Sequence, residues 1–149
     1  MSCRIERDSL DRYSSVIRLA GDVDLYDAPE LKDLMAESIR AGTRHLICDL
    51  SEVTFIDSTA LGVMIQARKR LEPDGGSIRV ACPGPAIADI FEAVGLDRMV
   101  PVHASLDDAI AAVRIYRGPV DGPIAKRSGV KRWLASVGRS PTKGRYAGG

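Results

Sequence analysis

Along the first 116 residues, segments in which apolar residues have the spacing typical of strands alternate with segments in which they have the spacing typical of helices. In the segment 45–50, Leu46, Cys48 and Leu50 alternate with other side chains, which predicts a strand that buries these three on one face and Ile47 on the other. The predicted elements are strands at 3–7, 15–20 and 45–50, a helix at 28–40, a helix at 57–71, a strand at 77–82, a helix at 86–94, a short extended segment at 99–102 and a helix at 105–116.

The ends of the first predicted helix are marked by residues with known positional preferences. Asp27 suits the N-cap, Pro29 suits the first turn, and Glu30 favours the positive end of the helix dipole. Gly42 follows the last apolar position and closes the element. Between strand 15–20 and this helix, we expect residues 21–24 to form a loop.

The series of elements has the order β-β-α-β-α-β-α-β-α. Strands that alternate with helices pair in parallel with right-handed crossovers, so the sequence predicts an α/β fold, a small sheet with helices packed on it. The length of 149 residues suits one domain with a sizeable core.

Charge divides the chain into two parts that the overall net charge of +1 hides. Residues 1–113 carry 12 Lys and Arg against 19 Asp and Glu, whereas residues 114–149 carry 9 against 1. Gly-Pro pairs at 118–119 and 122–123 mark a linker. We therefore expect a domain at residues 1–115 and a basic, flexible tail containing glycine and proline at residues 116–149.

Within the tail, the segment 126–139 has a basic amphipathic pattern. Val130, Trp133, Leu134 and Val137 follow helical spacing among lysines and arginines. The pattern leaves several targets open: a membrane surface, an acidic partner, nucleic acid or the acidic body of this chain, besides a tail without a fixed structure. Direct DNA binding is not expected of the protein.

Composition and motifs exclude several classes of protein. No apolar run approaches the ~18 residues of a membrane span, and the N-terminal residues lack the pattern of a signal peptide. The three cysteines, Cys3, Cys48 and Cys82, form no CxxC pair and are interpreted as reduced thiols of a cytoplasmic protein, with two of them in core strands. The histidines, His45 and His103, stand alone and are interpreted as structural or solvated. Neither a metal site, a cofactor nor catalytic residues are expected, and we predict that the chain is not an enzyme.

The most informative segment is 55–62, where the pattern changes from strand to helix. It places the Ser58 hydroxyl at a helix N-terminus, where unpaired N–H groups and the helix dipole tolerate an anion such as a phosphate. The alternative is that Asp57, Ser58 or Thr59 only caps the helix, since these residue types are the commonest N-caps.

The segment 49–62, DLSEVTFIDSTALG, resembles the signature of the STAS domain found in bacterial anti-sigma factor antagonists. Supporting pieces lie at 21–24 (GDVD), 75–76 (GG) and 94–96 (VGL), and the resemblance covers roughly residues 3–115 in the family's order of elements. It implies the STAS fold, a small mixed β-sheet with helices packed on it. The chain departs from the family at Ala60, where glycine is frequent; alanine is small and a better helix former, so little effect is expected.

The resemblance also implies a function. In this family, an unphosphorylated antagonist binds an anti-sigma factor, a serine kinase of the histidine-kinase-like ATPase fold, and so releases a sigma factor. The kinase then phosphorylates the serine after the signature aspartate, and a phosphatase resets it. By position, the phosphoacceptor is Ser58, with Thr59 as the alternative, and the expected partner-binding residues are Asp22, Asp24, Asp57, Thr59 and Leu61.

Two other readings of the same residues remain to be compared with this one. A receiver domain would use Asp57 as its phosphoacceptor, but it needs an acidic pair after its first strand and a lysine near its last strand, and the chain has neither at those places. A regulatory STAS scaffold module, in a lipid-transport or stress-sensing assembly and without a working phosphoswitch, fits the pattern as well.

Overall fold

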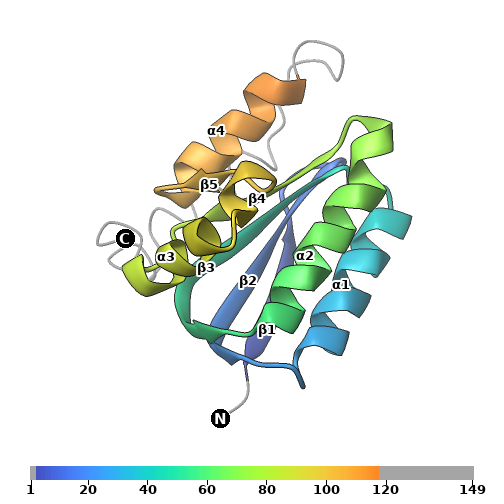
Figure 1. The fold of residues 1–149 in the computed structure, drawn as a ribbon. Coiled ribbons are helices and arrows are strands. Elements are labelled where there is room, and N and C mark those ends of the chain that lie inside the picture. Colours follow the sequence, from blue (N-terminus) through green and yellow to red (C-terminus); the bar gives the residue numbers. More distant parts are fainter. Residues whose placement is uncertain (1–2, 118–149) are drawn as a thin grey trace.

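The computed structural model describes residues 3–117 and shows a five-stranded sheet with the order β1-β2-β3-β4-β5 (Figure 1). β1 pairs with β2 in antiparallel fashion, and the other neighbours are parallel. The sheet is therefore mixed, as the resemblance implies. The strands are β1 (Arg4–Ser9), β2 (Ser14–Val23), β3 (His45–Ile56), β4 (Ser77–Ala81) and β5 (Val102–His103).

Within the described residues, four α-helices cover the two faces of the sheet unequally (Figure 1). The helices are α1 (Ala28–Arg40), α2 (Ser58–Leu71), α3 (Pro85–Ala93) and α4 (Leu106–Arg117), with 3₁₀ turns at Glu72–Asp74 and Leu96–Arg98. The larger core joins α1, α2 and α3 to one face of the sheet, and the smaller core joins α4 to the other. None of the helices in the described part of the chain is long and apolar enough to cross a membrane.

The alternation predicted for β3 divides its side chains between these two cores. Leu46, Cys48 and Leu50 are buried in the larger core, whereas Ile47 is buried in the smaller one. The prediction is confirmed for all four residues, because successive side chains of a strand point to opposite faces.

The largest differences in length from the sequence prediction are found in three elements. β2 continues through the expected loop to Val23, and β3 continues past residue 50 to Ile56. In these added segments β2 and β3 pair with each other, up to Val23 beside Ile56. This pairing extends both strands across polar residues. The segment expected to be extended at 99–102 is a strand only from Val102 to His103, because the N–H groups of Met99 and Val100 still bond to the Leu96 carbonyl and continue the preceding turn.

The two histidines and three cysteines lie within the packed body. His45 is buried, and its Nδ1 lies 2.9 Å from the Ser77 hydroxyl, while Nε2 of His103 lies 3.2 Å from an Arg79 guanidinium nitrogen. Both histidines therefore make structural contacts. All three cysteines are buried as free thiols; Cys48 lies in β3, but Cys82 follows β4 instead of ending it.

The predicted tail lies almost entirely outside the described residues. α4 ends at Arg117, one residue beyond the start of the predicted tail at 116, and the amphipathic segment 126–139 lies beyond it.

Candidate functional site

The candidate site begins where β3 passes into α2. Asp57 takes an extended conformation (φ −88°, ψ 154°) as the N-cap of α2, and its Oδ1 accepts a hydrogen bond from the Thr59 N–H at 2.7 Å. Its carbonyl oxygen accepts from the N–H groups of Ala60 at 3.0 Å and Leu61 at 3.2 Å. Asp57 thus satisfies the first turn of the helix with both its side chain and its backbone.

Asp57 is also tied to the neighbouring strand and is ionised at neutral pH. Its N–H donates to the carbonyl of Val23, the last residue of β2, at 2.8 Å. Hydrogen bonds from the Thr59 backbone N–H and from the Thr59 side chain hold the pKa of the Asp57 carboxyl below its usual value. A permanent negative charge therefore stands directly before Ser58.

Ser58 is the first residue of α2, and its side chain is exposed. Because Asp57 supplies the cap, the Ser58 hydroxyl is not the capping group of α2. The hydroxyl lies instead on the surface at the positive end of a 14-residue helix. A phosphate on this oxygen would face the helix N-terminus and the Asp57 carboxylate together.

Asp22 and Asp24 lie at the same end of the sheet. Asp22 is opposite Phe55 in the β2–β3 ladder, and its Oδ1 accepts a hydrogen bond from the Thr54 hydroxyl at 2.6 Å. Oδ1 of Asp24 accepts from the Tyr26 N–H at 2.9 Å, while the Asp24 N–H donates to the Asp27 side chain at 3.0 Å. The Asp27 side chain closes this loop instead of capping α1.

Three exposed apolar side chains accompany these carboxylates, and the sequence analysis did not single them out. Leu25 is 52% exposed, Tyr26 is 82% exposed and Phe55 is 47% exposed. Leu25 and Tyr26 are large apolar residues between two aspartates in a loop, and such loops are normally polar. This pattern could have indicated an exposed apolar surface from the sequence alone. We call the assembled surface the Ser58 corner and define it by Asp22, Asp24, Leu25, Tyr26, Phe55, Asp57, Ser58 and Thr59.

Leu61 does not belong to this surface. It was expected to bind a partner, but its side chain is only 6% exposed and packs in the larger core. It packs there with other buried residues of α2, among them Ala60 and Met64. The structure therefore assigns Leu61 a packing role, and we do not include it among the partner contacts.

The carboxylates of Asp22, Asp24 and Asp57 in the Ser58 corner accept hydrogen bonds from neighbouring groups. Within residues 3–117, no group of three His, Cys, Asp or Glu side chains converges in a way that could hold a metal ion. Asp22 and Asp57 lie on neighbouring strand ends, but each accepts hydrogen bonds from nearby residues, as described above.

The mixed five-stranded sheet and its helices match the fold of STAS-type α/β domains, and Ser58 is the second residue after the central strand. Residues 5–109 match the STAS domain model, and the chain belongs to this family. Within it, the chain is of the anti-sigma factor antagonist type.

The relatives support the family over most of their own length. An anti-sigma-B factor antagonist from Staphylococcus aureus is 28% identical over 103 residues, which cover 69% of this chain and 94% of the relative. The crystal structure of an anti-sigma factor antagonist from Mycobacterium paratuberculosis is 30% identical, with a TM-score of 0.69 and coverage of 76% of this chain and 95% of that one.

The fold is also that of the anti-sigma factor antagonist SpoIIAA. Its unphosphorylated form is 23% identical and has a TM-score of 0.68, with coverage of 74% of this chain and 96% of that one. The phosphorylated form of SpoIIAA from Bacillus is 22% identical, has a TM-score of 0.62, and covers 74% of this chain and 100% of that one.

Proposed function

We propose that this protein is an anti-sigma factor antagonist whose binding to an anti-sigma serine kinase is switched off by phosphorylation of Ser58. The observation that carries the proposal is made at the start of α2, where the Asp57 side chain caps the helix and the Ser58 side chain remains exposed. The relatives named as anti-sigma factor antagonists, and the existence of SpoIIAA in both phosphorylation states, support it.

In the unphosphorylated protein, the Ser58 corner offers both apolar area and charge to a partner. Leu25, Tyr26 and Phe55 provide exposed apolar surface, and aromatic residues are enriched at the energetic centres of protein interfaces. Asp22 and Asp24 flank them and favour a partner with basic side chains at its rim.

Phosphorylation would change this surface by charge more than by folding. A phosphate on Ser58 adds about −1.5 to −2 charge, which the N-terminus of α2 accommodates locally. The ionised Asp57 and the carboxylates of Asp22 and Asp24 add to the negative potential. A partner that fits the neutral hydroxyl then meets both bulk and like charge, which weakens docking.

The proposal gives the chain the role of a kinase substrate and not of an enzyme. The anti-sigma kinase, of the histidine-kinase-like ATPase fold, would supply ATP and Mg²⁺, and a phosphatase would restore the hydroxyl. Capture of the kinase frees a sigma factor, which places the interaction in the cytoplasm. The three free, buried cysteines fit a reducing compartment.

Capture of partners from a lysate of the source organism tests this function. Wild type, Ser58→Ala and Ser58→Asp serve as baits, and mass spectrometry identifies the captured proteins. We expect wild type and Ser58→Ala to capture a kinase-fold anti-sigma protein, and Ser58→Asp to lose roughly tenfold or more of it. Equal capture by all three baits would contradict the switch and favour a STAS scaffold module without one.

Phosphorylation by the captured kinase tests whether Ser58 or Thr59 is the acceptor. Thr59 binds Asp57 through both its N–H and its side chain, so its hydroxyl is engaged while that of Ser58 is exposed. We expect Ser58→Ala to abolish phosphate incorporation and Thr59→Ala, the matched control, to retain it. Phosphopeptide mapping measures this, and incorporation that persists in Ser58→Ala would reassign the acceptor.

A further inference from the structure

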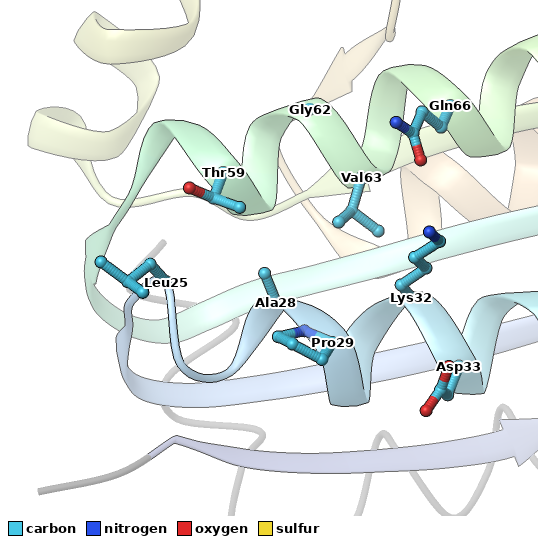
Figure 2. Close-up of a pocket in the computed structure, with 9 residues that line it drawn as sticks. All are labelled: Leu25, Ala28, Pro29, Lys32, Asp33, Thr59, Gly62, Val63 and Gln66. Atoms are coloured by element: carbon cyan, nitrogen blue, oxygen red, sulfur yellow. The ribbon is translucent and has the colours of Figure 1, made fainter.

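A groove of about 570 Å³ lies between α1 and α2 and adjoins the Ser58 corner, since Leu25 and Thr59 belong to both (Figure 2). Its lining is mostly apolar: Ala28 of α1 and Val63 of α2 point toward each other across it, and Leu25 stands at one end. Sites for small organic ligands have volumes of about 300–1,000 Å³ and an apolar lining with a few polar groups. The groove has the size of such a site, and its polar groups define which ligand it suits.

Two basic side chains and an amide lie at the end of the groove away from Leu25. Figure 2 shows the Lys32 side chain extending from α1 toward Gln66 of α2. The groove continues past these two residues as a narrow cleft of about 50 Å³, which Arg70 lines together with both of them. Gln66 and Arg70 are four residues apart on α2 and therefore lie on one face of the helix. Two cations from two different helices thus border one short stretch of the groove.

These two cations are not neutralised by carboxylates in the described part of the chain. Within residues 3–117, neither Lys32 nor Arg70 forms an ion pair, whereas Arg68 on the same helix as Arg70 pairs with Glu72 at 3.0 Å. Asp33 is the one carboxylate of the lining, and Figure 2 shows its side chain pointing away from α2. This end of the groove therefore favours an anionic group.

The other end of the groove disfavours an anion. Asp57 caps α2 two residues before Thr59 and is ionised, and Asp24 directly precedes Leu25 in the loop. Like charges repel, so an anionic ligand turns its charged group toward Lys32 and its apolar part toward Leu25. The groove is thus polarised along its length, which is the pattern expected for a ligand with one apolar end and one anionic end.

We propose that the groove between α1 and α2 binds a medium-chain fatty acid anion, with the carboxylate at Lys32 and Arg70 and the chain along Ala28 and Val63. The guanidinium group presents parallel N–H donors that match the two oxygens of a carboxylate, and the lysine ammonium adds a second positive charge. Binding requires neither a kinase nor a phosphate, so this site goes beyond the proposed function and does not rest on it.

The length of the groove selects the ligand for the test. From Thr59 to Gln66, α2 rises by about 10 Å, which is close to the length of an extended chain of about eight carbon atoms with bonds near 1.5 Å. Sodium octanoate, below its micelle concentration, is therefore the probe. Octylammonium has the same chain and the opposite charge, and acetate has the same head group without the chain.

Four variants of the full-length protein locate the binding site. Lys32→Gln and Arg70→Gln each remove one cation, and Lys69→Gln is their matched control, because Lys69 is exposed on α2 but lines neither part of the groove. Gly62→Leu fills the apolar part, since Gly62 lines it and a Cβ placed there would meet no atom within 4 Å. Amide correlation spectra show whether each variant is folded and report binding residue by residue.

We expect octanoate to shift the amide signals of Gly62 and Val63 saturably, with a dissociation constant of about 1 mM or lower. Octylammonium and acetate should bind roughly tenfold more weakly or less. Lys32→Gln and Arg70→Gln should each weaken octanoate binding about two- to fivefold, whereas Lys69→Gln should leave it unchanged. Gly62→Leu should abolish the saturable shifts.

Several results would overturn the proposal. These are the absence of saturable shifts with octanoate, binding of octylammonium as tight as that of octanoate, and unchanged octanoate affinity in Gly62→Leu or in both Lys32→Gln and Arg70→Gln. Because no kinase takes part, these outcomes are independent of the capture experiment.

Discussion

Three consecutive residues at the start of α2 perform three different tasks. Asp57 caps the helix, Ser58 exposes its hydroxyl, and Thr59 holds the Asp57 carboxylate through its N–H. The sequence pattern predicts the junction itself, because three polar residues separate a strand pattern from a helix pattern. It cannot choose the capping residue, since all three residue types are good N-caps. That choice depends on the backbone angles at Asp57, which its hydrogen bond to Val23 helps to fix.

The cap predicts a pH-dependent stability at this residue. The pKa of Asp57 is lower in the folded protein than in the unfolded one, so its stabilisation is present above the unfolded pKa and is lost as the pH falls through the folded pKa. We expect Asp57→Ala to lower the midpoint of thermal unfolding by a few degrees at neutral pH and by less below the ordinary Asp pKa of about 4. Asp57→Asn, which keeps an acceptor oxygen but lacks the charge, should lie between wild type and Asp57→Ala at neutral pH. A pH-independent effect of Asp57→Ala would contradict the role of the charge.

At the scale of elements, β2 and β3 support each other beyond the point where their own sequences stop resembling strands. Gly21 and Asp22 are poor strand residues, yet both pair with β3. Register shifts near Ala20 and Asp22 mark where the pairing adapts to them. Local patterns predicted the cores of these strands but not their ends, because the ends depend on a partner strand more than twenty residues away. This added length is what brings Asp22 next to Phe55.

Alanine substitutions at two glycines are expected to change the free energy of unfolding in opposite directions. Gly62 is helical with free space around its missing Cβ, so Gly62→Ala should raise the free energy of unfolding by about 0.5–1 kcal/mol. A Cβ on Gly76 would lie 2.2 Å from the Arg44 carbonyl oxygen, so Gly76→Ala should lower it. Chemical denaturation measures both. Destabilisation by Gly62→Ala, or no effect of Gly76→Ala, would contradict the packing described around these two glycines.

At the scale of the whole molecule, the site forms where parts distant in sequence meet. The ends of β2 and β3 bring the aspartates at 22 and 24 to Ser58, and α1 and α2 together form the groove. The family resemblance implied that these aspartates and Ser58 belong to one partner-binding surface, and the parallel pairing of β2 with β3 puts the ends of both strands at one edge of the sheet. The sequence did not predict the groove or the burial of Leu61, because both depend on how helices pack on the sheet and on each other.

The burial of the three thiols is a property of the whole core and predicts their reactivity. Burial raises the pKa of Cys48 to about 12 and that of Cys3 to about 11, and it also raises the pKa of Cys82. The reactive thiolate is therefore scarce at pH values near 8. We expect slow modification of the native protein by a disulfide reagent and rapid modification of all three thiols in guanidinium chloride. Rapid reaction of the native protein would contradict the described packing.

The central claim is that one phosphate on Ser58 controls partner binding, and the affinity of the purified protein for its anti-sigma kinase tests it most directly. The dissociation constant is measured for the unmodified protein and for the same protein phosphorylated at Ser58, with Ser58→Ala, treated identically, as the control. The account predicts that the phosphate weakens binding by roughly tenfold or more, while Ser58→Ala binds as the unmodified protein does. Equal affinity of the phosphorylated and unmodified proteins would contradict it.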